Sequence, residues 1–327
     1  MSGDGGTARE RSRLAIQAAT QYYLHDVPMH EIAARLSVSR STVSRLIGHA
    51  RDQGWVHIEV RRPRDVLTAA ETRLAERAKL HYIGSVPTSA PVETLAAAAV
   101  AAASFLSSVV TDGANVAVAW GTTTEAIARA MRPSSRLGGT VVQLNGAGSV
   151  NDAGGSFAFE IVSELARSFN ARPEYFSVPA FFDDATTRAA LWNERSIARV
   201  VQAQTTADVA LFSVGSTRAD VPSHVHTAGY LSPADLAQLE RDGVVGDIAT
   251  VFYRSDGTSA GVELNSRSSG PPLDTLRAIP SRLCVAVGVG KAEALAASLR
   301  GGFVTHLIAD DELLERTGRL LAAPLVR

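Results

Sequence analysis

Pro28-Met-His-Glu-Ile-Ala-Ala-Arg-Leu-Ser-Val-Ser-Arg-Ser-Thr-Val-Ser-Arg-Leu-Ile47 has the apolar spacing of two short helices joined by a tight turn around Val38. The expected inner faces are aliphatic or small: Ile32, Ala33 and Leu36 in the first helix, Val43, Leu46 and Ile47 in the second. A small residue at Ala33 lets the two helices cross closely. The stretch therefore predicts a helix-turn-helix.

The second helix of this pair carries the residue types that bind DNA in a major groove. Ser39 is a natural N-cap, because its hydroxyl can accept from an early backbone N–H. Hydroxyl and guanidinium groups on the outer face can read base edges and hold phosphates. The predicted DNA-binding residues are Ser39, Arg40, Ser41, Thr42, Ser44 and Arg45.

The flanks of the motif separate it from an ordinary pair of amphipathic helices. Residues 14–24 predict a preceding helix, with an inner face of Ile16, Ala19, Tyr23 and Leu24. Gly54 is expected to end the second helix, and residues 55–60 alternate like the β-wing of a winged helix. One departure is Ser37, which stands where such turns often have glycine. We predict a winged helix-turn-helix DNA-binding domain over residues 1–62.

Composition bounds the rest of the chain. Its 327 residues suggest two domains, and 46% hydrophobic residues are enough for a sizeable core. The N-terminus lacks the apolar core of a signal peptide, and no apolar run is expected to reach the length of a membrane span, so we expect a cytoplasmic protein with no membrane partner. The single cysteine, Cys284, excludes an internal disulfide and is expected to be an inert buried thiol.

Charge is divided unevenly along the chain. Residues 1–64 hold ten basic and six acidic side chains, a net charge of +4, which leaves −5 for the remainder. A basic N-terminal segment can approach DNA while an acidic remainder is repelled by it. This asymmetry supports the helix-turn-helix prediction.

After a linker at residues 61–64, the pattern is that of an α/β domain over residues 63–327. A helix over residues 65–80, with Asp65 as its N-cap, comes first. Strands are predicted at 81–86, 115–119, 140–144, 174–178, 209–214, 248–253, 283–287 and 304–308. Helices are predicted between them at 91–109, 123–131, 157–169, 186–204, 233–241, 291–299 and 311–321. This alternation predicts a Rossmann-like, doubly wound parallel sheet, with a possible hairpin turn at Asp256-Gly257.

Ligands of such folds bind beyond the carboxyl ends of the strands, and three loops there carry suitable groups. Gly121, Thr122, Thr123 and Thr124 open a helix and can cradle an oxyanion. Asn145 and Gly146 can contact sugar hydroxyls, although a glycine-rich turn alone is a weak signal. Lys291, one of only two lysines, starts a helix after the strand at 283–287 and can supply a compact charge.

Taken together, these motifs resemble the SorC-type (DeoR-like) sugar-binding transcriptional regulators, over nearly the whole chain. The resemblance is carried by the helix-turn-helix and by stretches at residues 120–123, 141–146, 243–248, 287–292 and 307–312. It implies an effector domain with a phosphosugar isomerase-like fold that has lost catalysis. It also implies a homodimer or homotetramer that binds double-stranded operator DNA.

The resemblance further implies roles for particular residues. Gly121, Thr122 and Thr123 would hold the effector's phosphate or terminal oxygens, and Asn145 and Gly146 its body; Asp247 and Lys291 would also bind the effector. Some relatives carry a basic residue near Asn145, whereas this chain has none there, so the resemblance does not extend to tight phosphate binding at that loop. Because no lysine occurs near Asn145 either, a Schiff base with the effector is not expected there. The implied effector is a sugar, polyol or sugar phosphate, with no cofactor and no metal.

Two other functions remain open on the sequence. A sugar-phosphate isomerase or deaminase would need a carboxylate base with a proton-transfer partner, for which Asp183, Asp184, Asp247, His224 and His226 are the candidates. His224 and His226 lack a third metal ligand at helical spacing. An architectural DNA binder without a ligand would leave the three loops unexplained. We therefore predict a regulator without catalytic residues.

Overall fold

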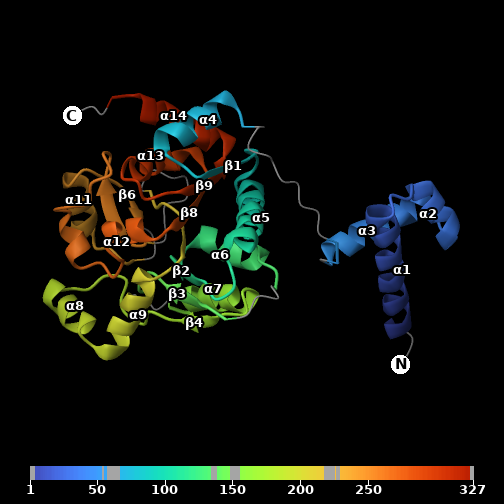
Figure 1. Cartoon of the computed structure of the whole chain (residues 1–327), viewed down its shortest axis with the longest axis horizontal. Helices are drawn as coiled ribbons and strands as arrows, with labels where there is room; N and C mark the ends of the chain where they lie inside the picture. Colours follow the sequence, from blue (N-terminus) through green and yellow to red (C-terminus); the bar gives the residue numbers. More distant parts are fainter. Residues whose placement is uncertain are drawn as a thin grey trace. The chain divides into compact units, whose positions relative to one another are not determined.

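The computed structural model describes residues 4–53, 55–56, 67–133, 138–147, 155–216, 225 and 229–324. Its contacts divide the chain into two compact units, residues 1–62 and residues 63–327 (Figure 1). The gap at residues 57–66 contains the predicted linker, Asp65 and most of the predicted wing, and Gly54 also lies outside the described residues. Each unit is described by itself.

The first unit consists of α1 (Asp4–Leu24), α2 (Met29–Leu36) and α3 (Arg40–Asp52). The predicted inner faces of α2 and α3 form its core, because Ile32, Val43 and Ile47 are buried there. The predicted inner face of α1 is partly wrong. Ile16 and Leu24 are 49% and 75% exposed, and the face is built on alanines instead: Ala15, Ala18 and Ala19. Small side chains there let α1 pack closely against α3.

The second unit is built on a seven-stranded sheet in which every recorded pairing is parallel. The strand order is β1-β9-β8-β5-β2-β3-β4. The strands are β1 (Tyr82–Val86), β2 (Asn115–Val118), β3 (Thr140–Gln143), β4 (Arg172–Glu174), β5 (Val209–Phe212), β8 (Ser281–Ala286) and β9 (His306–Asp310). The predicted parallel α/β architecture is therefore confirmed.

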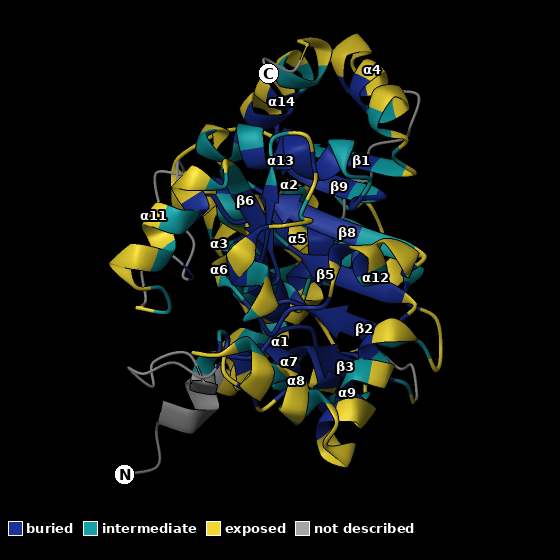
Figure 2. Ribbon diagram, turned by 90° about the vertical axis from the view of Figure 1, so that its left-hand side faces the viewer, coloured by how far each residue is buried: buried dark blue, intermediate teal, exposed yellow. Residues whose placement is uncertain are grey.

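Helices cover both faces of this sheet, and each face has its own buried cluster (Figure 2). One layer holds α5 (Pro91–Val109), α6 (Thr122–Ala130), α7 (Gly155–Ser168) and α11 (Pro233–Arg241). The other holds α4 (Ala69–Ala78), α9 (Arg195–Thr205), α12 (Leu273–Ala278), α13 (Ala292–Arg300) and α14 (Asp311–Ala322). The remaining described helices are α8 (Ala185–Trp192), η2 (Glu263–Ser266) and η3 (Val289–Lys291).

The predicted single strand at residues 248–253 is wrong. The chain forms two antiparallel strands there, β6 (Val244–Ile248) and β7 (Val251–Arg254). They are joined at Ala249 and Thr250, which both have positive φ (49° and 67°). Such a turn normally uses glycine or asparagine, so Ala249 and Thr250 are not residues from which a hairpin would be predicted. The expected Asp256-Gly257 hairpin is only a local turn, closed by the Thr258 N–H on the Asp256 carboxylate.

Other boundaries also moved. The helix predicted from Asp65 starts at Ala69, because Thr68 and Glu71 form a capping box. The strand expected at residues 174–178 lies at Arg172–Glu174, and the helix expected at 186–204 is split into α8 and α9. Helix α12 was not predicted.

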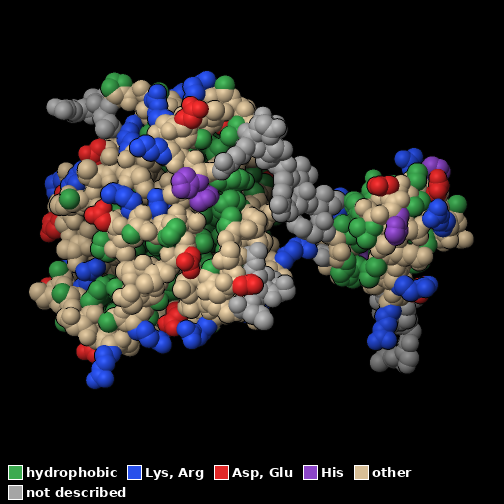
Figure 3. All heavy atoms as spheres, viewed as in Figure 1, with side chains coloured by type: hydrophobic (Ala, Val, Ile, Leu, Met, Phe, Trp, Pro, Cys, Tyr) green, Lys and Arg blue, Asp and Glu red, His purple; other side chains and the backbone are tan. Residues whose placement is uncertain are grey.

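Helix α5 is long and apolar enough to cross a membrane by length and composition, with a mean hydropathy of 1.6, contrary to the expectation from the sequence. One face of it is buried on the sheet, through Ala98, Ala102 and Leu106 at helical spacing. Apolar side chains also gather beside α5 on the visible surface, where Val92 and Val100 are exposed (Figure 3). The packing is that of a core helix of an α/β domain.

Candidate functional site: a helix-turn-helix and polar loops at the strand ends

The helix-turn-helix places its predicted DNA-binding residues at the start of α3. Ser39 is the N-cap, and its hydroxyl accepts from the Thr42 N–H at 3.1 Å. The same hydroxyl lies 2.8 Å from the Ser41 hydroxyl and 2.9 Å from that of Thr42. The Arg45 guanidinium donates to the Thr42 hydroxyl at 3.4 Å and thereby lies against the same turn. Arg40 and Ser44 are exposed.

The turn between the helices has the left-handed conformation that a glycine would adopt without strain. Ser37 has φ 55° and ψ 42°, and its N–H donates to the carbonyl of Ala34 at 3.2 Å. A residue with a Cβ is disfavoured in this conformation. The sequence departure at Ser37 therefore has a structural consequence.

In the second unit, the loops that follow β8, β5, β2 and β3 are neighbours, because these four strands are adjacent in the sheet. They bring together all three predicted loops at residues 288–291, 120–124 and 145–147. The fourth loop, Ser213 to Ser216 after β5, was missed. Its serine-glycine composition at the end of an apolar strand was the available signal.

The loop after β2 presents the N-terminus of α6. Gly121 is the N-cap and supplies no capping side chain, so the first N–H groups of α6 have no side-chain acceptor at this position. Thr123 and Thr124 are buried, and the Thr124 hydroxyl donates to the Gly121 carbonyl at 2.9 Å. Thr122 is exposed. Free N–H groups at a helix start are suited to an anion.

The loop after β3 is held rigidly by its backbone. Trp120 Nε1 donates to the Gly146 carbonyl at 2.9 Å, and the Gly146 N–H donates to the Ser269 hydroxyl at 2.9 Å. A Cβ on Gly146 would lie 2.4 Å from the carbonyl oxygens of Val178 and Pro179, so only glycine fits there. The Tyr230 hydroxyl donates to the Ala147 carbonyl at 3.1 Å.

Asn145 on this loop has a side-chain oxygen, Oδ1, to which none of the described residues donates a hydrogen bond. The residue is 2% exposed. A buried amide oxygen without a donor carries a desolvation penalty of about 1–3 kcal/mol. A ligand hydroxyl at this place would remove that penalty.

Asp247 and Lys291 lie near each other but belong to different elements. Asp247 lies on β6, whose backbone pairs with Gly215 of the loop after β5 at 2.9 Å and 3.3 Å. Lys291 Nζ lies 3.2 Å from the Ser213 hydroxyl. Burial lowers the pKa of the Lys291 ammonium, while the nearby Cys284, Asp247 and Asp310 act to raise it.

The remaining candidates are a buried thiol, two acidic residues and two histidines. Burial raises the pKa of the Cys284 thiol to about 12, as expected for an inert buried cysteine. Asp184 is the N-cap of α8, and Asp183 beside it is exposed. His224 and His226 lie outside the described residues. No cluster of metal-binding side chains occurs among the residues that the structure describes.

Comparison with known proteins covers both units. A family model described as "Putative sugar-binding domain" matches residues 64–316, and a model of sigma-70 region 4 matches residues 9–53. The deoxyribonucleoside regulator of Bacillus subtilis is 32% identical over 320 residues, covering 97% of this chain and 99% of that protein. The transcriptional regulator LsrR of Escherichia coli K12 is 27% identical over 301 residues, covering 89% and 90%.

Solved structures agree. A domain of a possible sugar-binding transcriptional regulator from Arthrobacter aurescens is 38% identical, with a TM-score of 0.71 over 79% of this chain and all of that one. The full-length sorbitol operon regulator SorC of Klebsiella pneumoniae shares the fold, with a TM-score of 0.78 over 94% of this chain and 98% of that one at 22% identity. The chain therefore belongs to the family of sugar-binding transcriptional regulators with an N-terminal helix-turn-helix region, the family of the deoxyribonucleoside regulator, LsrR and SorC.

Proposed function

We propose that this protein is a transcriptional regulator whose affinity for operator DNA is set by a sugar, a polyol or a sugar phosphate. The observation that carries the proposal is a convergence of polar groups in a chain that also holds a helix-turn-helix. The open start of α6, the buried Asn145 Oδ1 and Lys291 lie on neighbouring loops, and Asp247 of β6 lies near Lys291. Polar groups converging in this way suit a polyhydroxylated ligand.

Each group has a proposed role. The N–H groups and hydroxyls of Gly121, Thr122, Thr123 and Thr124 bind a phosphate or the terminal oxygens of the effector. Asn145 and Gly146 contact its body. Asp247 accepts from sugar hydroxyls, and Lys291 supplies the positive charge for an anionic or hydroxylic group.

On DNA, α3 is proposed to lie in the major groove. Ser41, Thr42, Ser44 and Arg45 read bases, Arg40 holds phosphate, and Ser39 caps the helix. The protein is proposed to act in the cytoplasm as a homodimer or homotetramer, so that two first units meet two operator half-sites. Effector binding changes operator affinity because the ligand binds two subunit arrangements unequally. The domain is proposed to bind its ligand without converting it.

The first experiment is a thermal shift of the full-length protein against sugars, polyols and their phosphates, because a ligand of the folded state raises the melting temperature. Lys291→Met is expected to abolish the shift and the change in operator affinity, while operator binding itself persists. Lys79→Met is the matched control, since Lys79 is the other lysine and lies exposed at the end of α4. A Lys291→Met protein that still responds would remove Lys291 from the site.

Base reading is tested on Arg45. Arg45→Ala is expected to weaken binding to the operator by about 1–3 kcal/mol more than binding to random DNA, if its fork is bidentate to a guanine. Gel-shift or anisotropy titrations at fixed salt measure both affinities. Equal losses on the two DNAs would make Arg45 a phosphate contact.

A further inference from the structure

Asp310 joins two elements through one buried carboxylate. It is the last residue of β9 and is 1% exposed. Its Oδ1 accepts from the Leu313 N–H at 3.0 Å, which caps α14. Its Oδ2 accepts from the Gly288 N–H at 2.7 Å. The start of α14 and the start of the loop that carries Lys291 therefore share one anchor.

The same carboxylate acts on Lys291 electrostatically. The charged or titratable groups that face the lysine are Cys284 on β8, Asp247 on β6 and Asp310 at the end of β9. The carboxylates of Asp247 and Asp310 favour the protonated amine, against the effect of burial. Of these three, Asp310 also holds the lysine's own loop by a recorded hydrogen bond.

We propose that Asp310 is a positioning residue of the effector site, which holds loop 288–291 and helix α14 in one arrangement so that a shift of the loop also shifts the helix. The inference rests on the proposed function, because that function assigns a ligand to this loop. A carboxylate with both oxygens engaged on different elements cannot follow one of them without straining or breaking its bond to the other.

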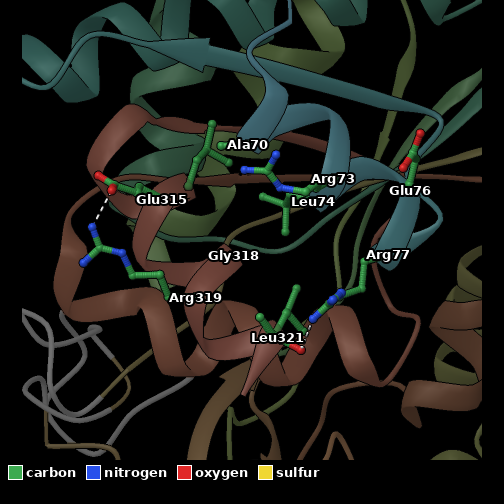
Figure 4. A pocket seen from close by; sticks show the side chains of 11 residues that line it. Ala70, Arg73, Leu74, Glu76, Arg77, Glu315, Gly318, Arg319 and Leu321 are labelled. Carbon is green, nitrogen blue, oxygen red and sulfur yellow. Dashed lines mark hydrogen bonds and ion pairs between the residues drawn. The ribbon is translucent and has the colours of Figure 1, made fainter. Parts of the chain in front are cut away.

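Helix α14 leads from this anchor to α4. The two helices pack together, and the Arg77 guanidinium of α4 donates to the Leu321 carbonyl of α14 at 2.9 Å (Figure 4). A groove of about 680 Å³ lies along them, lined by Leu74 and Leu314 at its base and by Arg73 and Arg319.

The path ends at α4, which is the first helix of the second unit among its described residues. A displacement of α14 that moves α4 would therefore act on the described helix that follows the helix-turn-helix unit in the sequence.

The chain contains an internal reference for testing the position of Lys291, because Lys79 and Lys291 are its only lysines. Acylation of each amine is followed by mass spectrometry across a pH series on the full-length protein without ligand. Asp310→Ser keeps a good N-cap for α14 but removes the carboxylate from the loop and the lysine. The titration midpoint of Lys291 is expected to fall by roughly one pH unit, with faster acylation, while Lys79 is unchanged.

Asp184→Ser is the matched control, because Asp184 caps a helix in the same way, but that helix is α8 and not α14. It is expected to leave both lysine profiles unchanged. A folded Asp310→Ser protein with an unaltered Lys291 profile would overturn the proposal. Should Asp310→Ser fail to fold, the nearly isosteric Asp310→Asn gives the same readout.

A double-mutant cycle tests the link to the helix. Lys291→Met perturbs the loop, and amide hydrogen exchange reports on α14 and on residues 69–78. In the native background, Lys291→Met is expected to change the amide exchange rates in α14. In the Asp310→Ser background, the same substitution is expected to cause no further change in these rates. Additive effects in the two backgrounds would refute the coupling. No ligand or DNA is used, so this result stands apart from the outcome of the effector screen.

Discussion

At the scale of single residues, the first unit carries a strained position that its sequence made visible. Ser37 adopts the left-handed conformation that the turn requires, although it has a Cβ. Its neighbour Ser39 provides the N-cap that the sequence predicted. The turn is therefore held by the packing of α2 and α3 around Ile32 and Val43 rather than by the preference of its own residue.

Ser37→Gly is expected to stabilise the first unit by about 1 kcal/mol, because glycine accepts this conformation without the steric cost that a Cβ brings. Hydrogen exchange of the α2 and α3 amides in the full-length protein measures the change. Ser44→Gly is the control: it makes the same substitution at an exposed position inside α3 and is expected to destabilise by about 1 kcal/mol. Loss of protection in both variants would contradict the strain at Ser37.

At the scale of elements, the β6–β7 hairpin decides where Asp247 lies. The hairpin packs on α13 and pairs with Gly215 after β5. Gly246 sits at this contact: a Cβ there would lie 2.6 Å from Ala294 Cβ, 2.8 Å from the Gly215 carbonyl oxygen and 2.9 Å from Tyr253 Oη. Because residue 246 has no side chain, the hairpin can pack closely at this point, and Asp247 beside it comes near Lys291.

Gly246→Ala is expected to destabilise the second unit by about 1–3 kcal/mol, because the overpacked hairpin must move away from α13 and the loop after β5. Denaturant unfolding measures the loss. Gly318→Ala is the control: it lies inside α14 with open space around its Cβ position, so it is expected to stabilise by about 1 kcal/mol. An unchanged stability in Gly246→Ala would mean that the hairpin is not docked as described.

At the scale of the whole molecule, carboxylates tied to turns and helix starts set the response to acid. The Thr88 hydroxyl lowers the pKa of Asp311, and the backbone N–H of Thr258 lowers that of Asp256. Burial acts to raise the pKa of Asp235, but Ser232 and Arg267 lower it on balance. Each of these groups binds its proton less readily in the folded protein than in the unfolded chain.

These shifts fix the sign of the pH dependence. The folded pKa values lie below the ordinary value of 3.8, so the unfolded chain takes up more protons as the pH falls, and the contributed stability is present above that value and lost below it. Because of these carboxylates, the melting temperature is expected to decrease as the pH is lowered below about 4. Thermal scans at constant ionic strength check this. The melting temperature of Asp235→Asn should decrease less on acidification than that of the native chain. No loss down to pH 3 would contradict the assigned shifts.

Features that depend on local spacing could be predicted from the order of the residues. The helix-turn-helix, the cap at Ser39, helices α5 and α11 to the residue, and the alternation of strands and helices all follow from periodicity and capping, which neighbouring residues carry. The positions of Gly121, Asn145 and Lys291 after apolar strands also followed, because a parallel sheet gathers its carboxyl ends at one edge.

Features that depend on contacts between distant segments could not be predicted in this way and are seen only in the folded protein. Ile16 and Leu24 are exposed because α1 meets α3 along its alanines, and the hairpin turn forms at Ala249 and Thr250 against local preference, with Gly270 packed closely on the Ala249 carbonyl. The strand order likewise placed the loop of Ser213 beside Lys291, and the end of β9 placed Asp310 against Gly288. Spacing along the chain records helix and strand faces but not which faces meet, because that choice is made by packing across tens to hundreds of residues.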